Sequence, residues 1–381
     1  MGKTTRIRKY LREAVRVVKQ VFYFPSEIIK LMVVRRWYDA VTSRSIRYTF
    51  GKVAIRDEAA IYLIFPSGGV QGSHREMLNE MIAQKIAPIV VSNIPLGDED
   101  RRVIADLAAI IIERPNVGYD FGGYRDAVLF LRKQILQLRY LWILNDSVWP
   151  IKQKDSWFDV ARSKNTDFVA ATSNYGMPRV DPSRYMEIDW RYSTDHRNFH
   201  YASYALGLRS SILQLPAFWS YWEKLNISSD KSKTVRRGEI GFSQFVISKN
   251  LSHSETFEVK KLDKDLAACT DEELDKIARE LVIPDDEILE ALQAQVLKTS
   301  IVSEQGRRER IALILTTVAR RASIYCLPCF AVPRGFHFLK KSPLALPGQT
   351  YVNEVRLIKN VCGSVNYDLE LEMEAILDRR L

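Results

Sequence analysis

The chain has 381 residues, of which 46% are hydrophobic and 27% charged, and this balance excludes a disordered or fibrous protein. Its net charge of +10 is concentrated at one end, because the first fifty residues hold twelve Lys and Arg against three Asp and Glu, and the rest holds 44 against 43. A basic folded face typical of nucleic-acid-binding proteins is therefore not expected, and we predict no nucleic-acid partner. The sequence contains neither an uninterrupted apolar run of about 18 residues nor a signal-peptide core, so we expect a cytoplasmic protein.

Residues 10–25, "YLREAVRVVKQVFYFP", predict a basic amphipathic helix within an N-terminal arm taken as residues 1–50. The apolar residues recur at helical spacing and the basic residues fall on the remaining faces. Helices of this kind lie on anionic membranes, where each basic side chain contributes about 1 kcal/mol. The same apolar stripe could instead pack on the protein's own core or on a partner. We expect the arm to hold the protein peripherally on the inner face of the plasma membrane.

From residue 59 to residue 150, short apolar runs alternate with amphipathic stretches. The alternation predicts an α/β fold with a mostly parallel sheet flanked by helices on both faces. Ligands of such sheets bind at the carboxyl ends of the strands, so the polar residues that follow each strand are candidate ligand contacts. The expected strands are 59–69, 87–97, 108–116 and 140–150, and the expected helices are 73–86, 98–108 and 124–138.

The remainder of the chain is less regular. A domain spanning residues 51–262 is expected to continue the α/β pattern, and residues 263–381 are expected to form a mainly helical region that could serve as an acceptor platform, a membrane contact or a dimer interface. The expected elements after residue 150 are a helix at 155–163, a strand at 166–174, a strand entering a helix at 199–213 and followed by an aromatic stretch at 217–225, and helices at 240–250 and 271–297.

Four segments carry a resemblance to a known family: "NVGYDFGGYRDAVLFL", "LNDSVWP", "FHYASYALGLRSSIL" followed by "FWSYW", and "GEIGFSQF". In this order they resemble segments of the rhamnan synthesis F family of bacterial polysaccharide proteins, over about residues 59–250. The first two also resemble the nucleotide-sugar half of a GT-A glycosyltransferase of the family-2 type, in which an Asn-x-Gly segment and a helix with an early Arg precede a strand ending in an acidic DxD-like motif.

The resemblance implies a GT-A-like glycosyltransferase that moves a sugar, rhamnose or another hexose, from a nucleotide-sugar donor. The implied acceptor is a growing cell-surface polysaccharide such as O-antigen, or its lipid-linked precursor. Other polysaccharide-assembly proteins are implied as partners.

The donor's diphosphate gains charge as the glycosidic bond breaks, so its site must offer backbone amides, cations or a divalent metal. Gly122 and Gly123 are predicted to bring backbone amides near this group, and Arg125 to donate hydrogen bonds to it. The alternative is that the glycines serve tight packing of a helix against a strand. Further donor contacts are predicted from position after a strand, or from the resemblance, at Ser67, Asn93, Asn116, Gly118 and Asn145.

Carboxylates and one histidine are the candidates for sugar and metal contacts. Asp120 is predicted to accept hydrogen bonds from hydroxyls of the donor sugar or ribose, with a helix N-cap as its alternative role. "NDS" departs from a full DxD motif because Asp146 is its one carboxylate, yet one carboxylate with phosphate oxygens and water suffices for Mg²⁺ or Mn²⁺. The resemblance implies His200 as a further metal ligand, and a hydrogen-bonded core residue is the alternative.

Inverting sugar transfer needs a carboxylate that removes the proton of the acceptor hydroxyl. Glu239 matches the family's Glu in "RRGEIGFSQF" and is our predicted base; the alternative is a carboxylate that complements the dipole at a helix start.

Two other functions are weighed. The incomplete DxD motif motivates a catalytically inactive, membrane-associated scaffold of a polysaccharide assembly. A dinucleotide-dependent enzyme fits the alternation, but "PSGGVQGSH" after the first strand lacks the required glycine spacing.

Overall fold

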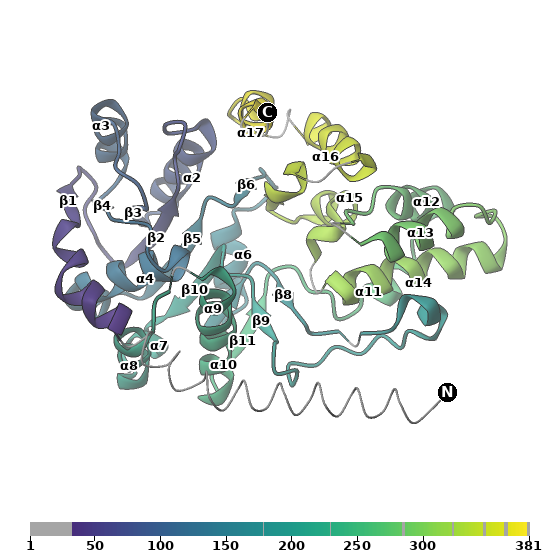
Figure 1. Ribbon diagram of the computed structural model, residues 1–381, viewed down its shortest axis with the longest axis horizontal. Coiled ribbons are helices and arrows are strands. Elements are labelled where there is room, and N and C mark those ends of the chain that lie inside the picture. The colour runs from purple at the N-terminus through teal and green to yellow at the C-terminus, as the bar shows by residue number, and fades with distance from the viewer. Residues whose placement is uncertain are drawn as a thin grey trace, which may run out of the picture.

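The computed structural model describes residues 33–378, apart from residues 178, 229, 284–285, 322–323, 346–347 and 362–364. The amphipathic helix expected at residues 10–25 lies outside the described residues. A central sheet carries helices on both faces, and a helical region built from the later part of the chain extends to one side (Figure 1). None of the described helices combines the length and apolar composition that a bilayer crossing requires.

The central sheet has eight strands in the order β1-β4-β3-β2-β5-β10-β7-β11. Parallel pairing joins β4, β3, β2 and β5 as well as β7 and β11, whereas β1 and β10 run antiparallel to their neighbours. The mostly parallel α/β sheet predicted from the sequence is therefore confirmed. The strands are β1 (Arg47–Phe50), β2 (Glu58–Ile64), β3 (Ala87–Ser92), β4 (Ile110–Glu113), β5 (Tyr140–Asn145), β7 (Phe168–Ala170), β10 (Ala205–Arg209) and β11 (His253–Glu255).

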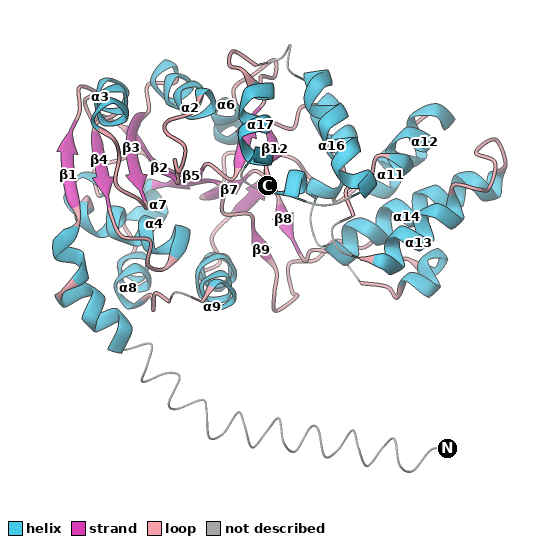
Figure 2. Ribbon diagram, turned by 45° about the horizontal axis from the view of Figure 1, so that its top comes forward, coloured by secondary structure: helices cyan, strands magenta, loops and turns pink. Residues whose placement is uncertain are grey.

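The inner strands are buried on both faces because successive side chains enter two different cores. In β2, Tyr62 and Ile64 belong to one hydrophobic cluster, and Ile61 and Leu63 belong to the other. Figure 2 shows α2 and α3 on one side of the sheet and α4, α7 and α8 on the opposite side. These helices are α2 (Gly72–Ala83), α3 (Asp98–Leu107), α4 (Tyr119–Phe130), α7 (Ser210–Leu213) and α8 (Pro216–Lys224).

The remaining elements complete the α/β part and form the C-terminal region. Three further small strands, β6 (Val148–Pro150), β8 (Ser173–Asn174) and β9 (His200–Tyr201), pair outside the main sheet, as does β12 (Phe338–Lys340). The helices are α5 (Arg132–Ile135), α6 (Trp157–Ser163), α9 (Lys231–Val235), α10 (Gly241–Ser248), α11 (Leu262–Ala267), α12 (Asp271–Arg279), α13 (Glu287–Val296), α14 (Glu304–Arg321), α15 (Pro328–Ala331), α16 (Gly348–Val361) and α17 (Leu369–Asp378); short 3-10 turns lie at Thr42–Ser45, Pro182–Glu187, Ile324–Cys326, Val332–Arg334 and Ser342–Ala345, and a π-helical turn, η3, lies at Arg236–Ile240.

Two strands that lie outside the expected domain of residues 51–262 pair with strands inside it. β1, inside the expected N-terminal arm, is an edge strand of the main sheet and pairs with β4. β12, inside the expected helical region, pairs antiparallel with β6, which directly follows β5. The arm and the C-terminal region therefore both contribute backbone to the α/β part.

The direction of the chain through the sheet reverses next to β2. From β2 the chain steps outward to β3 and β4, and it then returns to form β5 on the other side of β2. Ligands of open α/β sheets bind at such a switch point, outside the carboxyl ends of the strands. Here the two strand ends are joined through Asp146, whose amide donates to Leu63 O (3.1 Å) and whose Oδ2 accepts from Phe65 N (2.7 Å).

Candidate active site

Asp146 is held in an ionised state at the switch point. His74, in the first turn of α2, accepts from Gln71 N at Nδ1, so its Nε2 carries the proton and donates to Asp146 Oδ2 at 3.2 Å. Burial raises the pKa of Asp146, but its interactions with His74, the charge of Lys341 and the amide of Phe65 outweigh burial and bring the pKa below its ordinary value. Asp146 is therefore a fixed negative charge.

Asn145, the last residue of β5, is oriented by its neighbours. Its Oδ1 accepts from the amide and from the hydroxyl of Ser147, at 3.1 and 2.6 Å. Its Nδ2 therefore faces α4, where it donates to Asp120 Oδ2 (3.2 Å) and to Tyr124 OH (3.1 Å). The segment "NDS" thus contributes two groups to the site: the carboxylate of Asp146, and the side-chain amide of Asn145, which orients the carboxylate of Asp120.

A chain of hydrogen bonds connects Asp120 with Glu239. Beyond Asn145, the Tyr124 hydroxyl donates to Ser203 O at 3.2 Å, and the Ser203 hydroxyl donates to Glu239 Oε1. Tyr124 and Ser203 are buried. Because buried networks of this kind fix the side chains at their ends, the structure brings together the two carboxylates that the sequence analysis selected as catalytic.

The surroundings of Asp120 disfavour the ionised form of its carboxyl group. Burial, followed by the charges of Glu239 and Asp146, raises the pKa of Asp120 to about 6, although Lys340 and Lys231 oppose this rise. Asp120 is not the N-cap of α4. That position is Gly118, whose φ of +80° is left-handed and whose added Cβ would lie 2.9 Å from Ile227 Cβ.

Glu239 lies on the π-helical turn η3, between α9 and α10, rather than at the expected helix start. The helix begins earlier, after the N-cap Asp230, whose side chain accepts from Lys233 N. The wider π turn frees carbonyl groups, and the Tyr221 hydroxyl bonds to those of Arg237 (2.9 Å) and Gly238 (3.1 Å).

The turn η3 packs directly on α4. A Cβ added to Gly238 would lie 2.3 Å from the ring of Phe121, the residue after Asp120. The absence of a side chain at Gly238 therefore lets the backbone carrying Glu239 approach the first turn of α4 closely.

His200 contacts Glu239 and an amide. Its Nδ1 bonds to the carbonyl of Asn198 (2.8 Å), which can only accept, so the proton is on Nδ1 and the Nε2 lone pair faces Asn174 Nδ2 at 3.0 Å. Nε2 also lies 3.9 Å from Glu239 Oε2. That lone pair is engaged by the Asn174 amide, so His200 fits the alternative of a hydrogen-bonded core residue, and over the described ranges no three His, Cys, Asp or Glu side chains are grouped as a metal site.

Gly122, Gly123 and Arg125, which were predicted to contact the diphosphate, are instead packed against or bonded to groups of the protein. An added Cβ on Gly123 would lie 2.3 Å from Leu63 Cδ1 of β2, which supports the alternative of tight packing of the helix against a strand, and one on Gly122 would lie 2.1 Å from Val117 O in the loop before α4. Arg125 is buried, and its guanidinium donates to both carboxylate oxygens of Asp39 (2.8 and 3.0 Å) and to Trp222 O (3.1 Å). These bonds leave Arg125 poorly suited to hold a diphosphate.

The other predicted donor contacts lie at the ends of β2, β3 and β4. Asn93 is buried and accepts from Arg114 Nη1 at 2.6 Å, and Arg114 also binds Asp126 (2.6 Å) and Tyr38 (2.9 Å). Ser67 and Asn116 are exposed. Asn93 is thus fixed by a buried ion-pair network, which the sequence did not indicate.

Lys340 is the site residue that sequence reasoning missed. β12 places its Nζ 3.4 Å from Ser147 Oγ and 5.0 Å from the centre of the Tyr204 ring. Burial lowers the pKa of Lys340, and the charges of Glu239 and Asp120 oppose that change. The short run "FHFLKK" carries no signal that separates it from other apolar segments of the helical region.

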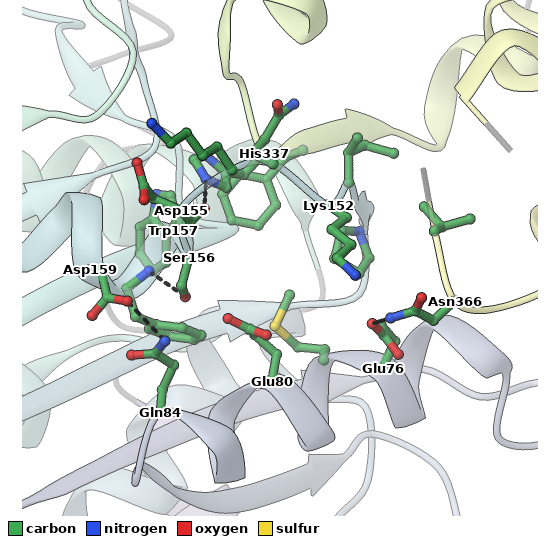
Figure 3. A pocket seen from close by; sticks show the side chains of 18 of the residues that line it. Glu76, Glu80, Gln84, Lys152, Asp155, Ser156, Trp157, Asp159, His337 and Asn366 are labelled. Atoms are coloured by element: carbon green, nitrogen blue, oxygen red, sulfur yellow. Dashed lines mark hydrogen bonds between the residues drawn. The ribbon is translucent and has the colours of Figure 1, made fainter. Parts of the chain in front are cut away.

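A separate cavity of about 470 Å³ lies along α2, between the loop after β6 and the strand β12. Several of its polar wall residues bind one another: Gln84 donates to Asp159 (3.0 Å) and Asn366 to Glu76 (2.8 Å), as the dashed lines in Figure 3 show. None of the predicted site residues lines this cavity. We therefore place the candidate active site at the strand ends.

Comparison with known proteins relates the chain to polysaccharide synthesis. Residues 88–285 match the family described as rhamnan synthesis protein F. The chain belongs to this family.

One relative of this rhamnan synthesis protein F chain is "Uncharacterized protein y4gN" from Sinorhizobium fredii, which is 30% identical over 204 residues, or 53% of this chain and 49% of the relative. The chain thus spans about half the length of that relative. Among solved structures, core-mannan synthase A from Aspergillus fumigatus in a Mn/GDP form covers 51% of this chain and 71% of its own at 11% identity and a TM-score of 0.28. The mannosyltransferase Ktr4p from S. cerevisiae covers 51% and 66% at 10% identity and a TM-score of 0.25. These two scores are too low to support a conclusion.

Proposed function

We propose that this chain is a glycosyltransferase that moves a hexose from a nucleotide-sugar donor to a growing polysaccharide or its lipid-linked precursor. The observation that carries the proposal is the pair of carboxylates, Asp120 and Glu239, joined by one buried hydrogen-bond network beside the switch point of the sheet. Membership of the rhamnan synthesis protein F family supports the polysaccharide context and favours rhamnose as the transferred sugar.

In the proposed reaction the acceptor oxygen attacks C1 of the donor sugar. The bond between C1 and the phosphate oxygen breaks, and its electron pair stays on the phosphate. Glu239 takes the proton of the acceptor hydroxyl, and the Ser203 hydroxyl holds its carboxylate in place. Asp120, ionised above about pH 6, accepts hydrogen bonds from donor hydroxyls that strengthen in the transition state.

The nucleotide is proposed to lie over the ends of β2, β3 and β4. Ser67, Asn93, Asn116 and Gly118 are its proposed contacts there, and Asn145 positions Asp120. A Mg²⁺ or Mn²⁺ ion carried by the donor phosphates needs few protein ligands, and Asp146 is the ionised carboxylate that fits this requirement. Such an ion supplies positive charge at the leaving group.

The test is to compare donor binding with transfer in Glu239→Gln. A panel of nucleotide sugars, each with and without Mn²⁺, is titrated calorimetrically and then assayed for hydrolysis and for transfer to membrane-extracted acceptor. We expect the wild type to bind one donor selectively. Glu239→Gln should retain that affinity within about threefold and lose transfer by about 10²–10⁴-fold, the usual contribution of a general base.

Glu223→Gln is the matched control, because Glu223 is exposed on α8 and pairs with Arg132. It should bind and transfer as the wild type does. If the folded wild type binds no donor, the proposal fails. Selective binding with no turnover under any condition would instead support the inactive membrane-associated scaffold.

We further propose that the N-terminal arm places the enzyme on an anionic membrane surface at the inner face of the plasma membrane. Residues 33–40 form a helix with Val33 and Trp37 exposed and with basic side chains at Arg35 and Arg36. Tyr38, the residue after Trp37, is buried against Arg114 and Asp126. The helix is thus fastened to the α/β part, where Arg35 also donates to Lys224 O (3.1 Å), while Val33, Arg36 and Trp37 are available to lipid.

A further inference from the structure

We infer that Lys340 binds the diphosphate of the donor and carries the positive charge that Arg125 was expected to supply. The inference rests on the proposed function and names a further binding residue for the same site. It assigns a role to the C-terminal region, since the residue is brought into the site by β12, which comes from that region.

The position of Lys340 is built into the backbone. β12 pairs antiparallel with β6, with Lys340 opposite Val148. The next amide, Lys341 N, donates to Ser147 O at 3.1 Å and continues the ladder toward Asp146. The ladder therefore fixes Lys340 beside the residues that immediately follow β5, at the end of the sheet where a ligand is expected.

The ammonium of Lys340 lacks a direct counter-ion in the described ranges of the chain. Its printed contacts are the Ser147 hydroxyl at 3.4 Å, a long hydrogen bond, and the face of Tyr204. Asp120 and Glu239 act on it only through space, whereas a largely buried charge normally requires a close partner. A phosphate oxygen beside Lys340 and Ser147 would supply that partner.

Neighbouring cations are committed elsewhere. Lys341 lies 3.3 Å from Gln71 Oε1, 3.5 Å from Ser73 Oγ and 3.9 Å from Glu372 Oε2. Arg125 is held by Asp39 and Trp222. Lys231 is exposed at the start of α9 and influences Asp120 through space. Lys340 is thus the partly buried cation that combines proximity to the carboxylate pair with weak contacts of its own.

This placement separates the proposed phosphate contacts from the carboxylates within the site. Ser147 and Lys340 lie on the Oδ1 side of Asn145, whereas Asp120 and Tyr124, through which the network reaches Glu239, lie on its Nδ2 side. When the bond between C1 and the phosphate oxygen breaks, the negative charge that stays on the phosphate develops beside the ammonium of Lys340, which stabilises it.

The experiment compares diphosphate with nucleoside binding in variants of the full chain. UDP, GDP, CDP and dTDP and the four matching nucleosides are titrated calorimetrically, in parallel with Mg²⁺ and with EDTA. In the wild type, the diphosphate should increase the affinity of one nucleoside markedly. In Lys340→Gln this increase should fall by about tenfold or more, as expected for loss of a hydrogen bond to a charged group, with nucleoside affinity unchanged. Lys340→Arg should retain part of it.

Lys231→Gln is the matched control for the general electrostatic field, because Lys231 also acts on Asp120 but is exposed. It should change the diphosphate increment by less than about threefold. Equal increments in wild type and Lys340→Gln would overturn the role of Lys340 and leave the proposed function intact. Absence of nucleotide binding in the wild type would overturn both.

A second measurement does not depend on a variant that folds. The wild-type protein is acetylated with and without the bound diphosphate, and modification of each lysine is measured by mass spectrometry. The diphosphate should protect Lys340 at least about threefold more than the matching nucleoside does, and it should leave Lys231 unprotected. Equal modification of Lys340 with either ligand would overturn the inference.

Discussion

Asp120 is a carboxylate whose ionised form the folded protein disfavours. Its pKa is raised to about 6 in the folded state, from an ordinary value of 3.8. Between about pH 4 and pH 6 the folded protein therefore binds a proton that the unfolded chain has released, and the contribution of this group to stability falls as the pH rises through that window. Above pH 6 the folded protein keeps the full unfavourable interaction.

Asp120→Asn should consequently be more stable and less active than the wild type. At pH 7 we expect the free energy of unfolding to rise by about 1–3 kcal/mol, because the amide keeps an acceptor for Asn145 and removes the repelled charge. Denaturant titrations should show this gain shrinking as the pH is lowered toward 4. Transfer should fall at least about tenfold, because the amide is a weaker acceptor for donor hydroxyls. A variant less stable than the wild type at pH 7 would contradict the assignment.

Candidate site residues could be predicted from the sequence where a short motif marks them, and not where their role depends on a partner far along the chain. Asp120, Asn145 and Glu239 lie in short motifs, and the structure brings them into one network. The role predicted for Arg125 failed because its partner Asp39 is 86 residues away and no local pattern indicates that pairing. The glycines of α4 were misinterpreted for a related reason, since a sequence shows where side chains are missing but not whether a ligand or Leu63 fills the space.

The π turn between α9 and α10 gives a test of how the site is assembled. In Gly238→Ala the new methyl group would overlap the Phe121 ring, so η3 must move away from α4. We expect destabilisation of about 1–3 kcal/mol and a fall in turnover, with donor affinity largely retained. Thermal melts and steady-state kinetics measure the two effects.

Gly241→Ala is the control in the same helix. Its added Cβ would find no neighbour closer than 3.7 Å, and Gly241 has helical dihedral angles. The variant should be as stable as the wild type or slightly more so, because Ala favours a helix, and it should be equally active. Similar losses of turnover in both variants would refute the specific packing of Gly238 on Phe121.

The elements themselves were predictable where they are long and periodic. The alternation of buried strands and amphipathic helices from β2 to β5 follows directly from residue patterns. By contrast, β1 and β12 have four and three residues and depend on partners far along the chain, so their local sequences carry little information. The π turn depends on contacts with Tyr221 and Phe121, which are likewise invisible to periodicity.

The proposed attachment to a membrane concerns the whole molecule. Trp37 is 63% exposed and is flanked by Arg36 and by the apolar Val33 one turn before. On adding vesicles that contain anionic phosphatidylglycerol, tryptophan emission should shift to shorter wavelength, and sedimentation should show the protein bound. Neutral phosphatidylcholine vesicles and 0.5 M salt should weaken binding at least about tenfold. Equal binding to neutral and anionic vesicles would contradict an electrostatic contribution.

The carboxylate of Glu372 adds hydrogen bonds between the C-terminal helix α17 and the α/β part to the apolar packing of Leu369 and Met373. Glu372 accepts from Ser73 N (2.6 Å), Ser73 Oγ (2.7 Å) and Trp149 Nε1 (2.9 Å). Glu372→Ala would leave buried donors unpaired, and we expect it to lower the free energy of unfolding by about 2–4 kcal/mol. Denaturant titration measures this loss, and Glu370→Ala, which changes an exposed residue on the same helix, should cost less than about 0.5 kcal/mol. Equal effects would mean that the contact contributes nothing.

The pairing of β12 with β6 also determines when during synthesis the site can be completed. Lys340 and Ser147 are 193 residues apart, so at about 5–20 residues per second the ribosome needs roughly 10–40 seconds to add the lysine after the serine. During that interval the nascent chain can form the parallel strands β2 to β5 but lacks the lysine that we propose as the diphosphate contact. We therefore expect a newly made polypeptide to lack this diphosphate contact until β12 has been synthesised.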